Sequence, residues 1–418
     1  MFSARTQVNL WKIFIVLEII NYQIVTILFN DFFLLKFMRD ILLMVIVAAT
    51  LAKGRIKVSK MLLGVGALIV FLLIAAIRTD SLSVILTYFR KYLSPVIFLL
   101  AVINTDFTDE KMYTDLLKYM LNVLFVFSLW GIFQAYILGP SFLMKLGYPT
   151  KYSNVFHTMA LKDSFYFGNL GIQRVVGTLS NANVCAVILG ASLITFAFNY
   201  KKVITSKWQL CKLLCVMVAY LLTFSRANFL ALIIVAIIAM WKYIPKKSII
   251  VLIGIFLIGC FGIMYFIQDS DGITHKLVNW VVNSLQFKES SAAGRTGIWK
   301  TAFDGVMNHP LGLGFGHTGT GVPGHVKSPL FFCENSYLAI AIDLGIAGLL
   351  AFVFYGVTIV AEIFRNRTDK RLFKMAITII VYVAITYVFS NHVYDRELNI
   401  VVGLLIGSTI VTMRRGRT

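Results

Sequence analysis

Charged residues are scarce in this chain, at 14% of 418 positions. Soluble domains carry about 25% charged residues, so the chain has too few charges to cover a soluble globule of its size. Acidic residues are the scarcest, with 19 Asp and Glu against 39 Lys and Arg. A soluble enzyme of several domains is therefore excluded.

Proline, glycine and cysteine are also sparse. Seven prolines and 29 glycines exclude a collagen-like or Pro/Gly-rich disordered chain. Most of the five cysteines lie within apolar runs, which is not the pattern of a disulfide framework. Cys211 and Cys215 share a helix face, but no His or carboxylate lies near them in sequence, so core packing is favoured over a metal site.

Hydrophobic residues make up 59% of the chain, and the mean hydropathy is +0.82. A helix needs about 20 mostly apolar residues to cross a hydrocarbon core roughly 30 Å thick. The sequence therefore predicts one all-α polytopic integral membrane domain over residues 1–418, with about twelve transmembrane helices. The predicted spans are 10–29, 33–52, 61–77, 83–103, 113–138, 182–199, 209–224, 228–243, 248–267, 335–357, 374–390 and 398–412.

The basic residues form short clusters between the apolar runs. These clusters are Lys53, Arg55, Lys57 and Lys60; Lys201, Lys202, Lys207 and Lys212; Lys242, Lys246 and Lys247; Arg365, Arg367, Lys370, Arg371 and Lys374; and Arg414, Arg415 and Arg417. A cytoplasmic N-terminus places all of them on the cytoplasmic side, as the positive-inside rule requires. We therefore expect both termini on the cytoplasmic side of the membrane, and no nucleic-acid surface. The acidic segment Asn104–Lys111 fits this arrangement poorly.

Two long segments, 139–181 and 268–334, fall on the periplasmic side in this topology. Loops of this length are usually functional or separately folded. Apolar residues recur at helical spacing in 277–285 and in Thr296–Asn308, which predicts short amphipathic helices, the second ending before Pro310. A glycine loop follows at 311–317; no strand precedes it, so it is no dinucleotide fingerprint, and we expect it to allow a close backbone approach.

A few charged residues lie on the predicted external side, and Arg90 with Lys91 interrupts the predicted span 83–103. A charge at membrane depth costs about 2.5–3.5 kcal/mol on insertion scales, so each needs a reason to be there. The candidates are Arg90 (beside Lys91), Arg174, Arg226, Arg295 and Glu334. Three of them also have an interpretation without a functional role. Arg226 could be an anchor that reaches to the membrane surface, Arg295 a solvated loop residue, and Glu334 an ordinary carboxylate in the first turn of a helix. Ser180 or Asn181 could likewise cap the helix after Arg174.

Taken together, the arginines, the single carboxylate and the glycine loop suit an anionic, membrane-borne substrate. A guanidinium pairs with phosphate oxygens in two places at once, so two arginines could hold a diphosphate without a metal. No periplasmic cluster of Asp and Glu resembles a magnesium site, and the sequence predicts no metal and no cofactor. His317, His325 and Asn335 are secondary candidates for the site.

Five motifs resemble those of the O-antigen ligase and polymerase superfamily. They are Arg174 with Gly177–Asn183 (GTLSNAN), Ser225–Leu230 (SRANFL), Gly294–Trp299 (GRTGIW), His309–Gly316 (HPLGLGFG), and Glu334–Leu338 (ENSYL) with Leu344–Leu349 (LGIAGL). The resemblance covers residues 174–349, and its motifs occur in the family's order.

This resemblance implies a metal-independent, inverting membrane glycosyltransferase of the GT-C type. Its donor would be a glycan on undecaprenyl diphosphate, and Arg226 and Arg295 would bind the diphosphate. The position of Glu334 is usually histidine in the ligases, where it is the base that deprotonates the acceptor. A carboxylate there favours a Wzy-type polymerase over a ligase. The resemblance also implies lipid-linked oligosaccharide substrates and a chain-length-regulating co-polymerase as a partner.

Two alternatives remain open from the sequence. The first is the ligase of the same superfamily, which transfers finished glycan to lipid A core. The second is a transporter or flippase of lipid-linked oligosaccharide, which would favour internal repeats and charges near the bilayer midplane. The sequence has no convincing internal repeat, and its candidate charges gather at one face.

Overall fold

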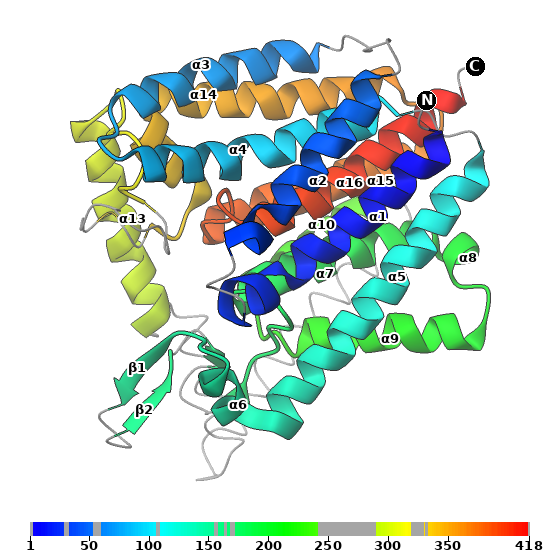
Figure 1. The fold of residues 1–418 in the computed structure, drawn as a ribbon, viewed down its shortest axis with the longest axis horizontal. Helices are drawn as coiled ribbons and strands as arrows, with labels where there is room; N and C mark the ends of the chain where they lie inside the picture. Colours follow the sequence, from blue (N-terminus) through cyan, green and yellow to red (C-terminus); the bar gives the residue numbers. More distant parts are fainter. Residues whose placement is uncertain are drawn as a thin grey trace, which may run out of the picture.

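The computed structural model describes residues 3–28, 33–52, 60–105, 109–153, 158–162, 165–167, 172–240, 290–318, 330 and 333–416. These residues form a helical bundle with a two-stranded antiparallel sheet at one corner (Figure 1), and a second two-stranded sheet is present. The helices are α1 Ala4–Asn21, α2 Phe33–Leu51, α3 Met61–Ile77, α4 Leu82–Ile103, α5 Glu110–Phe133, α6 Gly139–Lys145, α7 Ala182–Phe198, α8 Tyr200–Val203, α9 Lys207–Leu221, α10 Arg226–Met240, α13 Ser290–Asn308, α14 Ser336–Arg365, α15 Lys370–Phe389 and α16 Arg396–Arg415. Helices α1 and α5 continue as π-helical turns, Tyr22–Leu28 and Gln134–Leu138.

The predicted spans that lie within the described residues are all helical, and α3 has the predicted bounds 61–77. The predicted span 248–267 lies outside the described residues. In the described part of the chain, five helical segments are long and apolar enough to cross a membrane, and three further apolar helices are shorter. The five segments are Leu82–Ile103, Glu110–Lys145, Ser336–Arg365, Lys370–Phe389 and Arg396–Arg415. The chain is therefore a mostly helical membrane protein.

The two ends of the bundle differ in what they carry. Helix α3 lies beside α14, and α16 packs along α4. The start of α1 and the end of α16 lie at the same end, which we call the terminal end, whereas α13 covers the opposite end, the α13 end (Figure 1). At the terminal end, Arg414 donates to the Ile103 carbonyl at 2.9 Å and to Glu362 Oε1 at 3.1 Å. The two chain ends thus share one side of the bundle.

The structure accounts for the acidic segment that fits the charge rule poorly. Asp109 is the N-cap of α5, and its Oδ1 accepts a hydrogen bond from the Met112 N–H at 2.7 Å. Glu110 forms an ion pair with Lys202 of the basic cluster beyond α7. One acidic residue therefore begins a helix and the next neutralises a neighbouring lysine.

The segment 139–181 contains strands that the sequence did not predict. Strands β1 (Thr150–Ser153) and β2 (Thr158–Leu161) pair antiparallel, with Thr150 opposite Leu161. Strands β3 (Tyr166–Phe167) and β4 (Ile172–Gln173) form a second antiparallel pair. The expectation of helices alone was wrong here, because strands this short carry no period long enough to recognise. They pack on a small separate core of Leu143, Tyr148, Leu161, Phe165, Val176 and Ala182.

Helix α13 begins one and a half turns earlier than predicted. It starts at Ser290 rather than Thr296 and ends at Asn308 as predicted, because His309 precedes a proline. Serine is suited to the start of a helix and alanine to its interior, so the run from Ser290 to Ala293 extends the helix despite Gly294. The prediction that Arg295 lies in the loop before the helix was therefore wrong.

The glycine loop lies against a break in α14. Gly345 interrupts this helix with φ 80° and ψ 173°. The Leu313 N–H donates to the Ile342 carbonyl at 2.7 Å, and the Ile346 N–H donates to the Pro310 carbonyl at 2.9 Å. The close approach that the sequence predicted is therefore made to the protein's own backbone.

We expect Gly345→Ala to lower the stability of the protein by at least about 2 kcal/mol, because φ near 80° is strained for a residue with a Cβ atom. The new Cβ would also lie 2.6 Å from the Leu311 carbonyl carbon. Thermal unfolding in detergent measures the effect. Gly66→Ala in α3 is the matched control, because nothing lies within 4 Å of its Cβ position, and it should be neutral or slightly stabilising. Equal melting temperatures for the two variants would contradict the strain argument.

Candidate functional site

Arg174 joins two of the sequence motifs at the α13 end. Its Nε donates to the Thr223 carbonyl at 2.7 Å, and its Nη2 donates to Asn183 Oδ1 at 2.8 Å. Thr223 lies in the turn before Arg226, and Asn183 lies in the first turn of α7. The guanidinium of Arg174 is thus used to hold the Arg226 turn against the start of α7.

A second set of hydrogen bonds fixes the turn that carries Arg226. Ser225 Oγ donates to Asn183 Oδ1 at 2.9 Å, and Asn228 Nδ2 donates to Ser225 Oγ at 2.7 Å. The half-buried Arg226 stands between these residues as the first residue of α10. The position of its backbone is therefore set by polar side chains on both sides.

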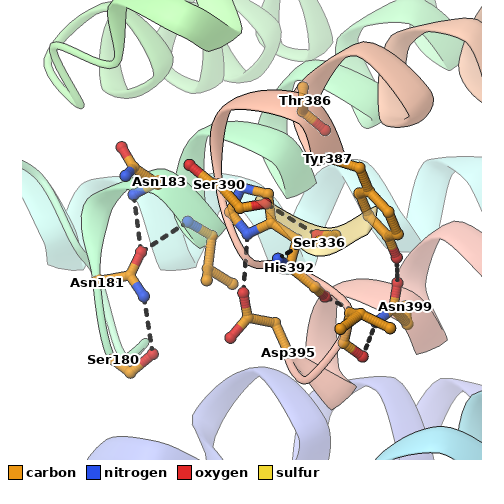
Figure 2. Close-up of polar contacts among 12 residues, drawn as sticks. Ser180, Asn181, Asn183, Ser336, Thr386, Tyr387, Ser390, His392, Asp395 and Asn399 are labelled. Atoms are coloured by element: carbon orange, nitrogen blue, oxygen red, sulfur yellow. Dashed lines mark hydrogen bonds and ion pairs between the residues drawn. The ribbon is translucent and has the colours of Figure 1, made fainter. Parts of the chain in front are cut away.

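Two of the asparagines at this end are helix caps. Asn181 Oδ1 accepts from the backbone N–H groups of Asn183 and Val184 at 3.0 and 2.9 Å, as the capping alternative predicted (Figure 2). Asn335 Oδ1 accepts from the Leu338 N–H at 3.0 Å and caps α14. The oxygen of Asn335 is thus engaged, and its side chain is buried.

Glu334 is exposed just ahead of this cap, and a tryptophan of α13 contacts its backbone. Trp299 Nε1 donates to the Glu334 carbonyl at 3.2 Å, and the Trp299 ring lies 6.2 Å from that of Phe389 at the end of α15. Arg295 lies on α13 one helical turn before Trp299. The structure therefore brings the helix of Arg295, the entry of α14 and the end of α15 together.

Arg90 lies in a different cluster. Its Nε is 3.2 Å from Asp40 Oδ2, and Asp40 also pairs with Arg396. Arg396 Nη2 is 2.9 Å from Glu18 Oε1, and Glu18 Oε2 accepts from Arg39 at 2.7 Å. Helices α1, α2, α4 and α16 each contribute to this network. The sequence did not reveal it, because its partners are separated by up to several hundred residues.

The remaining candidates are less informative. His317 is half-buried, and its pKa is lowered by burial and by the nearby His309. His325 lies outside the described residues. Burial raises the pKa of the Cys333 thiol to about 12, so this cysteine is not a nucleophile at neutral pH. Within the described ranges, no group of three His, Cys, Asp or Glu side chains is placed to hold a metal ion.

The turn between α15 and α16 carries a polar cluster at the start of α14. There, His392 Nδ1 lies 2.8 Å from Asp395 Oδ2, and the His392 N–H donates to Ser336 Oγ at 2.8 Å (Figure 2). Ser336 Oγ in turn donates to the Ser390 carbonyl at 2.8 Å. The turn is therefore tied to the first residue of α14, two positions beyond Glu334. The spacing of His and Asp after a span was the only signal in the sequence.

Comparison with known proteins supports the resemblance that the sequence motifs indicate. The O-antigen ligase family model matches residues 210–353. A curated O-antigen polymerase of Salmonella muenchen is 22% identical over 299 residues, which are 68% of this chain and 71% of that protein. Both matches are to proteins of the O-antigen ligase and polymerase superfamily, which the sequence motifs also resemble. The segment that matches the family model contains Arg226, Arg295 and Glu334, and the two matches support an O-antigen polymerase or ligase role.

Proposed function

We propose that this protein is a polymerase of surface-polysaccharide repeat units. It would transfer a glycan from undecaprenyl diphosphate to the non-reducing end of another lipid-linked repeat unit. The observation that carries the proposal is the junction of separate motifs at the α13 end. Arg174 holds the Arg226 turn, while Trp299, one turn from Arg295, is bonded to Glu334. This end would face the periplasm, and both chain termini would face the cytoplasm.

The two arginines would act on the leaving group. As the bond between the anomeric carbon and the diphosphate oxygen breaks, its electron pair and negative charge pass to the diphosphate. Fixed guanidinium groups at that point stabilise the developing charge, which lowers the barrier of this step. Arg226 on α10 and Arg295 on α13 would approach the diphosphate from two helices. This arrangement needs neither a metal nor another cofactor.

Glu334 would act on the other substrate. An acceptor hydroxyl attacks the anomeric carbon from the face opposite the leaving diphosphate, with inversion, and loses its proton to a base. A carboxylate within hydrogen-bond reach serves this role. The Glu334 side chain is exposed ahead of the α14 cap, where a substrate from outside the bundle can approach it.

A ligase is the second candidate, because the matching family model is described as an O-antigen ligase. Deletion of the gene separates the two functions. Loss of a polymerase leaves single repeat units on the surface lipid, whereas loss of a ligase leaves none. Purified protein that elongates lipid-linked oligosaccharide without an energy source would also exclude transport as its sole activity.

We expect Glu334→Gln to lower the elongation rate of the purified protein by about 100-fold or more, the usual contribution of a general base. Polymer length on gels, followed over time, measures the rate. Asp304→Asn is the matched control, since this carboxylate is exposed on α13 and has no assigned role, and it should elongate normally. A Glu334→Gln variant with full rate would reduce Glu334 to a helix-entry residue.

A further inference from the structure

His392 has one ring nitrogen that is buried and has no partner in the described part of the chain. The residue is 2% exposed. Its Nδ1 is bonded to Asp395, but its Nε2 makes no hydrogen bond with any described residue. A buried polar atom left in this state destabilises the folded protein, so it calls for an explanation such as a bound ligand.

The carboxylate of Asp395 determines whether the unpaired Nε2 is a hydrogen-bond donor or acceptor. An ionised carboxylate only accepts hydrogen bonds, so Nδ1 of a neutral imidazole carries the proton and donates it to Asp395. Nε2 then has a lone pair and no hydrogen. The atom left unpaired is therefore an acceptor, which suits a hydroxyl group as its partner.

Two more acceptors without partners lie on the adjoining segments. Asn391 Oδ1 and Asn228 Oδ1 are buried and make no hydrogen bond with described residues. Asn391 directly precedes His392, and Asn228 lies in the first turn of α10, which packs against α15. The other polar atoms of Asn228 are engaged, since its Nδ2 donates to Ser225 and to the Asn183 carbonyl. Unpaired acceptors at the same end of the bundle match a ligand rich in hydroxyl donors.

We propose that His392, held by Asp395, binds a hydroxyl group of the substrate glycan through Nε2, with Asn391 and Asn228 as further acceptors. This inference rests on the proposed function and adds a glycan-recognition site to it. The role is recognition, so proton transfer stays with Glu334. The site is tied to the start of α14 because the His392 N–H donates to Ser336 Oγ (Figure 2), and Ser336 is two positions beyond Glu334.

The test is a binding measurement on the full-length purified protein in nanodiscs. Two probes are compared: the lipid-linked repeat unit of the same cells, and undecaprenyl diphosphate without a glycan. We expect His392→Phe to weaken binding of the glycan-bearing probe by about tenfold, the effect of one lost hydrogen bond of about 1.4 kcal/mol. Binding of the bare diphosphate should be unchanged. His392→Gln, which keeps an acceptor, should recover part of the loss.

The melting temperature separates recognition from a structural role. Phenylalanine removes the unpaired nitrogen and leaves Asp395, which is partly exposed, to water, so we expect no large fall in melting temperature. In elongation assays we expect a higher KM and a kcat within about threefold of wild type. Arg365→Gln, which replaces a 60% exposed side chain at the end of α14, is the control.

Three results would overturn the inference. The first is unchanged glycan binding in His392→Phe, with or without a lower melting temperature, which would indicate a structural histidine or a fixed water. The second is equal weakening of both probes. The third is a lower kcat at unchanged KM, which would make His392 a proton carrier instead. A wild-type protein that binds the glycan-bearing probe but does not elongate it would refute the polymerase proposal alone.

Discussion

Arg226→Gln and Arg295→Gln should each lower the rate of polymer formation by about 100-fold. A hydrogen bond to a charged group is worth about 1.5–3 kcal/mol, and a guanidinium that grips a diphosphate makes two such bonds. Glutamine keeps the length and polarity of the side chain but removes the charge and the fork. The time course of polymer growth by purified protein measures the loss. Arg226→Lys should be intermediate, because an ammonium group keeps the charge but pairs at one point only.

The matched control for these variants is Arg365→Gln. Arg365 lies at the end of α14, at the terminal end, and its side chain is 60% exposed. Its replacement should leave polymer growth unchanged. Melting temperatures must accompany the rates, because Arg226 stands in a turn held by a polar network. Full activity in Arg226→Gln or Arg295→Gln would remove that arginine from the mechanism, and a loss of activity matched by a loss of folding would not count in its favour.

Arg396→Leu should destabilise the protein by about 3–5 kcal/mol, the cost of removing one partner of a buried ion pair. Arg396 contacts both Glu18 and Asp40, and the side chain of Glu18 is fully buried. Without Arg396, the partners that these two carboxylates keep among the described residues are Arg39 and Arg90. Unfolding in detergent, by melting temperature or denaturant, reports the change.

A second variant checks that the charge is responsible. In the background of Arg396→Leu, Glu18→Gln removes one of the carboxylates that lost a partner, so the double variant should be more stable than the sum of the two single effects predicts. Arg365→Gln again serves as the control, because the Arg365 side chain is 60% exposed even though its partner Glu362 is buried. Additive effects, or a stable Arg396→Leu protein, would contradict the interpretation of the network as a buried ion cluster.

The helices could be predicted from the sequence because membrane spans are local features. Runs of about 20 apolar residues identify themselves without knowledge of their neighbours, and α3 and the end of α13 at Asn308 came out as predicted. The capping role of Asn181 could also be predicted from the sequence, since a cap depends only on the residues that follow it. Features that depend on residues close together in the sequence could thus be predicted.

Features that depend on contacts between residues far apart in the sequence could not be predicted. Glu18 and Arg396 pair across 378 positions, and no periodicity connects them. His392 looked like an isolated histidine until the fold placed it beside Ser336 and Asp395. Of the proposed site, the sequence motifs supplied the identity of Arg226, Arg295 and Glu334. The fold supplied the contact between Trp299 and Glu334 that relates two of them.

The contact between the glycine loop and the broken α14 has a consequence for changes in the length of the chain between them. The loop is anchored up to Thr318, whose Oγ1 donates to Asp343 Oδ1 at 3.1 Å, and the chain is anchored again at the Asn335 cap. Between these fixed points, the chain can gain or lose residues at small entropic cost while the helices keep their packing. Insertions and deletions between Thr318 and Glu334 should therefore leave the broken helix and its Asn335 cap in place.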